Sequence, residues 1–219
     1  MIITIQDVLN TDDLQTIMGV VPQLAYEDGR ATAGWAAREV KDNEQASPGR
    51  ALDALRCMIS QRILANEVFA LAVRPKALTP LIISRYGAGR RYGAHVDDAL
   101  MNGMRTDVSF TLFLVDPDAY DGGELVIETT SGEESFKLPA GSMVTYPSTT
   151  LHRVEPVIRG ERCAVVGWAR SYVRSPEKRE LLFDLDRARR ALHEREGPST
   201  EFSLLSKTHA NLLRMWAED

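Results

Sequence analysis

Between Leu81 and Val173 the chain consists of short β-type runs separated by turn residues, and this pattern limits the fold more than any other feature. The longest run covers Asp107 to Val115. Two faces are expected for it: Val108, Phe110, Leu112 and Leu114 form one, and Ser109, Thr111 and Phe113 form the other. Several short strands at a spacing of roughly eight to twelve residues indicate an all-β sandwich or barrel. No long helical pattern interrupts the region, which argues against alternating strands and helices.

Helical periodicity flanks this region on both sides, with N-cap residues and prolines at the expected starts. We expect four helices: Thr11 to Val21, a second beginning at Ser47-Pro48, a third from Ser175-Pro176 to Gly197-Pro198, and a last from Glu201 to Trp216. The sequence therefore predicts one domain over 1–219. It is of the α+β class and mainly β, with a β core at 78–173, N-terminal helical support at 1–77 and a C-terminal helical segment at 174–219.

Composition and charge exclude several classes of protein. A net charge of -5 argues against a general nucleic-acid binder, because neutralising phosphates requires a basic surface. No run of about eighteen apolar residues is present, so we expect no membrane-spanning helix. The two cysteines, Cys57 and Cys163, are too few for a disulfide framework. We therefore expect a cytoplasmic protein with both thiols reduced and buried.

A glycine-rich stretch, Arg85 to Asp98, contains the first candidate metal ligands. In an extended segment, side chains two positions apart project to the same face, so His95 and Asp97 point together. A neutral imidazole and a carboxylate are two of the three ligands of the 2-His-1-carboxylate site of non-haem Fe(II) oxygenases. Asp98 has the opposite parity and is expected to face solvent or to support the ligands from outside. A His-x-Asp pair alone is also typical of a capped turn or a surface pair.

His152 is the candidate for the second histidine ligand. It follows a proline-containing turn after a predicted strand, near the end of the β region. As a loop histidine it would carry no function. His193 and His209 lie in predicted helices without a carboxylate at metal spacing, and we expect surface or packing roles for both.

Arg162 lies ten residues after His152 and opens the last predicted strand. Alternation places it on one face with Ala164, Val166 and Trp168, at the mouth of an apolar pocket if that face points inward. A buried guanidinium needs an anionic partner, and its planar fork fits a carboxylate. No acidic residue occupies the nearby positions on that face, so an anionic ligand is the natural partner. The alternative is a surface charge on an edge strand.

Eight segments of the sequence resemble the prokaryotic PKHD-type hydroxylases, a branch of the prolyl-4-hydroxylase-like Fe(II)/2-oxoglutarate dioxygenases. They are Asp28–Gly34, Arg85–Asp97, Met104–Leu114, Tyr120–Glu128, Lys137–Gly141, Leu151–Arg162, Leu181–Asp186 and Asn211–Glu218. The similarity extends over nearly the whole chain.

The resemblance implies a double-stranded β-helix, or jelly roll, as the β core. It also implies that His95, Asp97 and His152 bind iron and that Arg162 binds the distal carboxylate of 2-oxoglutarate. The expected reaction consumes O2, converts 2-oxoglutarate to succinate and CO2, and hydroxylates a peptidyl residue or a small molecule. Ascorbate is a candidate reductant.

Other residues are candidates for contacts with the co-substrate. In the wider superfamily a tyrosine at the place of Tyr86 often helps to hold the carboxylate, and Thr111 is a second candidate. Tyr92 is a competing hydroxyl.

The leucines of the C-terminal helices could also join two copies of the chain, although packing on the β core is the simpler use.

Two further functions fit part of the pattern. Two histidines and an aspartate can hold zinc with an open position, as in a zinc-dependent hydrolase or a metal-dependent isomerase. Arg162 counts against this hypothesis, because a hydrolase has no general need to bind an oxo acid. The other alternative is a non-catalytic β-sandwich that senses a metal or a small anion.

Overall fold

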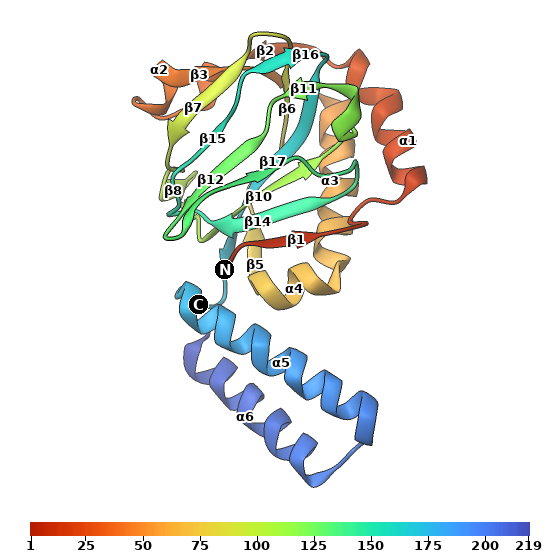
Figure 1. The fold of residues 1–219 in the computed structure, drawn as a ribbon, viewed down its shortest axis with the longest axis vertical. Coiled ribbons are helices and arrows are strands. Elements are labelled where there is room, and N and C mark those ends of the chain that lie inside the picture. Colours follow the sequence, from red (N-terminus) through yellow and green to blue (C-terminus); the bar gives the residue numbers. More distant parts are fainter.

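Two antiparallel β-sheets face each other across a layer of buried side chains in the computed structural model, which describes residues 1–219 (Figure 1). The larger sheet has the strand order β1 (Ile3–Ile5), β14 (Met143–Pro147), β10 (Val108–Phe113), β17 (Arg162–Ser171), β6 (Ile82–Tyr86), β4 (Glu44–Ala46) and β2 (Tyr26–Asp28), and β5 (Pro75–Leu78) also pairs with β17. The smaller sheet has the order β13 (Gly132–Phe136), β12 (Leu125–Thr129), β15 (His152–Val154), β7 (Arg91–His95) and β3 (Lys41–Asp42). Two short ribbons complete the β structure: β8 (Leu100–Met101) with β9 (Met104–Arg105), and β11 (Asp121–Gly122) with β16 (Val157–Arg159).

Strand β10 of the larger sheet packs on both faces, one against the helices and the other against the smaller sheet. All six of its residues are buried. Phe110 and Leu112 belong to the core beneath the helices, whereas Phe113 belongs to the cluster between the two sheets. The two predicted faces of this run are therefore confirmed, and both are covered.

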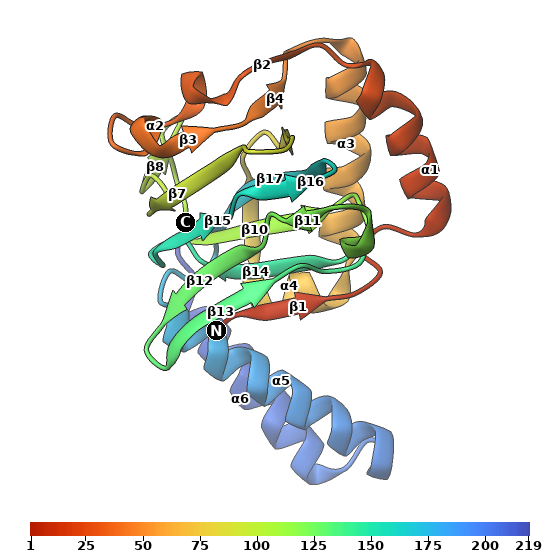
Figure 2. The same ribbon diagram turned by 45° about the horizontal axis from the view of Figure 1, so that its top comes forward.

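Three helices cover the outer face of the larger sheet: α1 (Thr11–Val20), α3 (Arg50–Ala65) and α4 (Glu67–Val73). The short helix α2 (Ala37–Val40) packs near β7. Helices α5 (Pro176–Glu196) and α6 (Thr200–Trp216) form a hairpin that extends away from the sheets (Figures 1 and 2). No helix combines the length and apolar character needed to cross a membrane.

The start of α3 differs from the prediction. The N-cap is Gly49, and the helix begins at Arg50 rather than at Ser47-Pro48. The backbone N–H of Ser47 donates to the carbonyl of Ala25 at 2.8 Å, which ties this residue to the end of the β2–β4 pair. A residue held beside a strand pair cannot also cap the helix, so the helix starts later.

Two other expectations need correction. The segment 1–77 was expected to be helical, but it also contributes β1 to β4 and most of β5. These strands have two to four residues, too few to show alternation in the sequence. Cys57 was expected to be buried and is exposed, since it lies on α3 away from the apolar stripe, whereas Cys163 is buried.

The two helical histidines have packing roles. His209 is 6% exposed, and its Nε2 atom lies 2.9 Å from Nη2 of Arg74. The ring of His193 packs on Phe202, with 4.7 Å between the ring centroids. Neither belongs to the single group of side chains with metal-ligand spacing in the structure.

The attachment of α3 to the larger sheet gives a first test of the fold. Ile59 has 0% exposure and lies in the core cluster. We expect Ile59→Ala to lower the free energy of unfolding by about 2–5 kcal/mol, because it removes buried methylene groups and leaves a cavity. Leu64→Ala on the same helix is the control, since Leu64 is 47% exposed. Urea unfolding measures both, and equal losses would contradict the packing described for α3.

Candidate active site

A cavity of about 490 Å³ opens beside the two sheets, and side chains from both sheets line it. His95 is the last residue of β7, and Asp97 follows two positions later. His152 is the first residue of β15, which pairs with β7 in a register that puts His152 directly opposite His95. The antiparallel register therefore brings together three residues that are far apart in the sequence.

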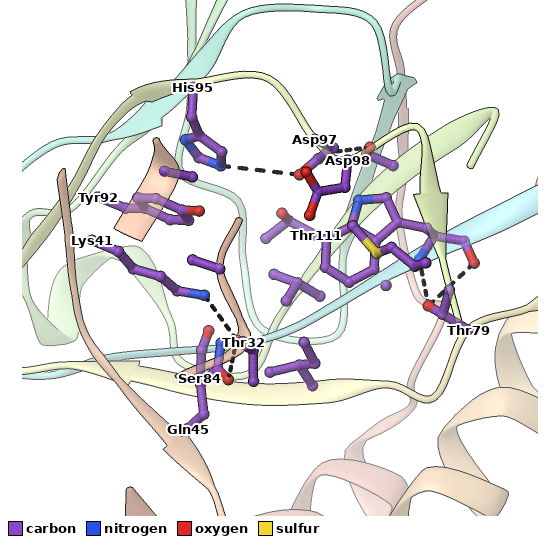
Figure 3. A pocket seen from close by; sticks show the side chains of 18 of the residues that line it. Thr32, Lys41, Gln45, Thr79, Ser84, Tyr92, His95, Asp97, Asp98 and Thr111 are labelled. Carbon is purple, nitrogen blue, oxygen red and sulfur yellow. Dashed lines mark hydrogen bonds and ion pairs between the residues drawn. The ribbon is translucent and has the colours of Figure 1, made fainter. Parts of the chain in front are cut away.

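The three side chains converge on one point. Nε2 of His95 lies 4.0 Å from Oδ1 of Asp97 (Figure 3). Nε2 of His152 lies 3.8 Å from Oδ2 of the same carboxylate. The candidate ligand atoms all lie within 4.8 Å of one another. All three side chains are 5–7% exposed. Two imidazoles and one carboxylate at this spacing fit a single divalent metal ion.

Backbone carbonyls orient both imidazoles. Nδ1 of His95 lies 2.9 Å from the carbonyl oxygen of Gly93, and Nδ1 of His152 lies 3.0 Å from that of Thr150. A neutral imidazole that donates through Nδ1 presents the lone pair of Nε2. Burial, followed by the neighbouring His152, holds the pKa of His95 below its usual value of 6.5. His95 is therefore neutral at pH 7, as a metal ligand must be.

Asp97 is oriented by a residue of the other sheet. The hydroxyl of Ser109, in β10, donates to Oδ2 of Asp97 at 2.6 Å. The hydroxyl of Ser148 lies 2.8 Å from that of Ser109 and extends the network. The sequence assigned Ser109 to the same face as Thr111 but gave no sign of its carboxylate partner, which lies just beyond the end of β7 of the smaller sheet.

Arg162 is a buried cation without an anionic partner. It is 1% exposed, and its Nε atom has no hydrogen-bond partner. Its guanidinium lies 5.3 Å from the ring centre of Tyr86 and 5.4 Å from that of Phe113. Such contacts compensate only in part for the lost hydration of a charge. The side chain lines the cavity, so a ligand with a carboxylate fits this position.

The candidate hydroxyls lie at different places in the cavity. Tyr86 is 3% exposed and pairs across β6 and β17 with Arg162. Thr111 is 2% exposed and also lines the cavity. Tyr92 instead stacks on His95, with 3.6 Å between ring centroids. The geometry thus puts Tyr86, rather than Tyr92, beside the arginine.

Two further residues of the site were not predicted from the sequence. Tyr146 packs edge-on against the ring of His152 at 5.0 Å. Lys41 is 6% exposed and lines the cavity from β3, and burial lowers its pKa to about 8. Its ammonium is therefore mostly protonated at pH 7. Neither residue stands in a sequence motif, because both reach the site through strand pairing.

Two family models match this chain. That of the 2OG-Fe(II) oxygenase superfamily matches residues 81–170, and that of the PKHD-type hydroxylase C-terminal domain matches residues 177–218. A PKHD-type hydroxylase of Picosynechococcus sp. is 50% identical over 219 residues, and one of Maricaulis maris is 49% identical over 219 residues; each match covers 100% of both chains. The chain belongs to the PKHD-type hydroxylase family.

Solved structures agree with this PKHD-type fold. A Pseudomonas putida prolyl-4-hydroxylase superposes with a TM-score of 0.55 at 22% identity, covering 78% of this chain and 92% of the other. A non-haem α-ketoglutarate-dependent carbocyclase from nogalamycin biosynthesis gives a TM-score of 0.60 at 14% identity, covering 78% and 80%. The predicted double-stranded β-helix with helices at both ends is confirmed.

Membership of the PKHD-type family also decides between the three functions considered from the sequence. The protein is a dioxygenase of the hydroxylase type, and it uses Fe(II), 2-oxoglutarate and O2. The zinc-dependent hydrolase and the non-catalytic sensor are not supported.

The contact between the sheets at Asp97 can be tested through metal affinity. We expect Ser109→Ala to weaken the binding of Fe(II) by about 10–100-fold, because the carboxylate loses the hydroxyl that orients it. Ser84→Ala is the control, since the Ser84 hydroxyl contacts the carbonyl of Ala164 and not Asp97. Anaerobic calorimetric titration measures both affinities, and equal affinities would contradict the role given to Ser109.

Proposed function

We propose that His95, Asp97 and His152 bind the Fe(II) of this dioxygenase and that Arg162 binds the distal carboxylate of 2-oxoglutarate. One observation carries the proposal: a buried His-Asp-His group shares its cavity with a buried arginine that has no anionic partner. Iron would occupy the His-Asp-His group, and a carboxylate of the oxo acid would pair with the arginine. Three protein ligands also leave coordination positions for the co-substrate and for O2.

The residues around the metal keep the ligands in the required state. Gly93 and Thr150 accept from the Nδ1 atoms, and Ser109 fixes one oxygen of Asp97. When bound, Fe(II) supplies the oxidative chemistry that converts 2-oxoglutarate and O2 to succinate and CO2 and hydroxylates the substrate.

The residues around Arg162 hold the far end of the co-substrate. Tyr86 and Thr111 support Arg162 there, and their burial excludes water from the carboxylate. Within a site of low polarity, charge-assisted hydrogen bonds to the guanidinium are stronger than in water.

The wider substrate class follows from relatives of the same fold. A prolyl hydroxylase of Trichoplax adhaerens was solved with a peptide fragment of hypoxia inducible factor, at a TM-score of 0.54 and 15% identity. The carbocyclase from nogalamycin biosynthesis is named for a different reaction. The fold accepts several chemistries, so the substrate here is proposed only as a peptidyl residue or a small molecule.

Three earlier expectations stay predictions: ascorbate as reductant, a cytoplasmic location and a homodimer formed through the C-terminal leucines. In helix α5, Leu181 is 59% exposed whereas Leu182 is buried, so only part of the leucine stripe is free for a second copy.

Removing any one ligand tests the metal site. We expect His95→Ala, Asp97→Ala and His152→Ala each to abolish the release of succinate from 2-oxoglutarate, because two ligands do not retain the metal. His193→Ala, which changes a histidine of α5, should keep full activity. Full activity in any of the three ligand variants would remove that residue from the site.

Arg162→Ala tests the co-substrate site separately. We expect the KM for 2-oxoglutarate to rise by about 10–100-fold, the effect of losing charge-assisted hydrogen bonds. Arg159→Ala is the control, since that arginine is 65% exposed and pairs with Asp121. Initial rates at varied 2-oxoglutarate measure both, and an unchanged KM in Arg162→Ala would exclude the proposed role.

A further inference from the structure

A second buried cation lines the cavity, and the functions assigned so far do not use it. Lys41 lies in β3, the edge strand of the smaller sheet, and is 6% exposed. Its ammonium donates to the hydroxyl of Thr32 at 3.1 Å, and that hydroxyl donates to Oε1 of Gln45 at 2.8 Å (Figure 3). The ammonium of Lys41 also lies 5.0 Å from the ring centre of Tyr92. Both direct partners of the ammonium, the Thr32 hydroxyl and the Tyr92 ring, are neutral.

A buried ammonium without an anionic partner lowers the stability of the fold. Lysine is almost never fully buried unless an anion pairs with it. One hydroxyl and one aromatic ring leave most of the three N–H donors and the charge uncompensated. Gln45 is 4% exposed, and its Nε2 group makes no hydrogen bond within the protein, so it is a second donor at the same place. Donors gathered around a buried charge form a site for an anion.

This anion site differs from the one at Arg162. Arg162 lies in the larger sheet among Tyr86 and Phe113, at the start of β17. Lys41 lies in the smaller sheet, paired with Tyr92, and its hydroxyl partner comes from the segment before α2. One co-substrate that reaches from the metal to Arg162 leaves Lys41 free.

The charges of the loaded cavity point to one further anion. The formal charges of Fe(II), Asp97, 2-oxoglutarate and Arg162 sum to zero. Asp98 also lines the cavity but is exposed to solvent. Lys41 then carries the one buried charge without a counterpart. A monoanion matches it, whereas a phosphate ester would add a second negative charge.

We propose that the Lys41 ammonium and the Nε2 group of Gln45, both held in place by the Thr32 hydroxyl, bind a carboxylate of the primary substrate. The enzyme would then hydroxylate a compound that presents a free carboxylate at this end of the cavity, such as an amino acid or the C-terminus of a short peptide. This inference rests on the proposed function, since it takes the metal and Arg162 to be occupied by the co-substrate.

Acetate is a direct probe of the carboxylate site. The protein is loaded with Zn(II), which is diamagnetic and redox-inert, and with saturating 2-oxoglutarate, and amide NMR shifts are followed during titration. We expect saturable shifts at residues 32, 41 and 45 with acetate and none with acetamide, which has the same shape without the charge. Lys41→Met should weaken acetate binding by about tenfold or more.

Matched variants separate charge from packing. Lys41→Arg keeps the charge and should retain acetate binding, and Lys207→Met, on the exposed surface of α6, should bind as the wild type does. The amide spectrum of each variant verifies that it is folded. Absence of saturable shifts in the wild type, or equal acetate binding by the wild type and Lys41→Met, would overturn the proposal.

The affinity for 2-oxoglutarate distinguishes the two cations. Lys41→Met should bind 2-oxoglutarate, with Zn(II) present, within about twofold of the wild type, because only the substrate site is changed. A larger loss would assign Lys41 to the co-substrate and overturn the proposal.

If the wild type binds neither Zn(II) nor 2-oxoglutarate, the proposed function fails, and not the proposal for Lys41. The comparison of acetate binding between wild type and Lys41→Met then still tests Lys41.

Discussion

The antiparallel pairing of β7 with β15 is the constraint on which the active site depends. His152 lies opposite His95 in this register, and a shift by one residue would turn one imidazole to the other face of the sheet. Asp97 lies two positions beyond the end of β7 and accepts a hydrogen bond from Ser109 in β10 of the larger sheet. The ligand group therefore depends on pairing within one sheet and on contact between the two. Both must be correct before a metal can bind with three ligands.

The same cavity opposes the stability of the fold. Among the side chains that line it, the carboxylate of Asp97 and the cations of Lys41 and Arg162 are buried, and burial of a charge without full pairing costs free energy. The core beneath the helices offsets this cost, since α1, α3 and α4 bury a continuous layer of apolar side chains against the larger sheet. The sheet that provides Arg162 is thus supported from behind. Strand β17 lies between β10 and β6, which fixes the position of Arg162 although no anion of the protein pairs with it.

Local sequence patterns were sufficient to predict much of this structure. The two faces of β10 follow from alternation, and the stripe of Leu52, Leu55, Ile59 and Ile63 predicts the buried face of α3. The pairing of His95 with Asp97 needs only a spacing of two, and the lack of acidic neighbours pointed to a ligand for Arg162. The contacts that escaped prediction are non-local. Ser109 donates to a carboxylate that lies just beyond a strand of the other sheet, and Lys41 lies in a strand of two residues, too short to show a period.

The residues proposed to bind the metal and the co-substrate lie in a different part of the chain from those proposed to bind the substrate. His95, Asp97, His152 and Arg162 all lie within the 81–170 region that matches the oxygenase superfamily model. Lys41, Thr32 and Gln45 lie before it, in a segment that crosses from the larger sheet to the smaller one and back through β2, β3 and β4 (Figure 2). A segment outside the shared oxygenase region can differ between enzymes without disturbing the metal or the co-substrate. Because it forms one wall of the cavity, it is the part of the chain best placed to select the substrate.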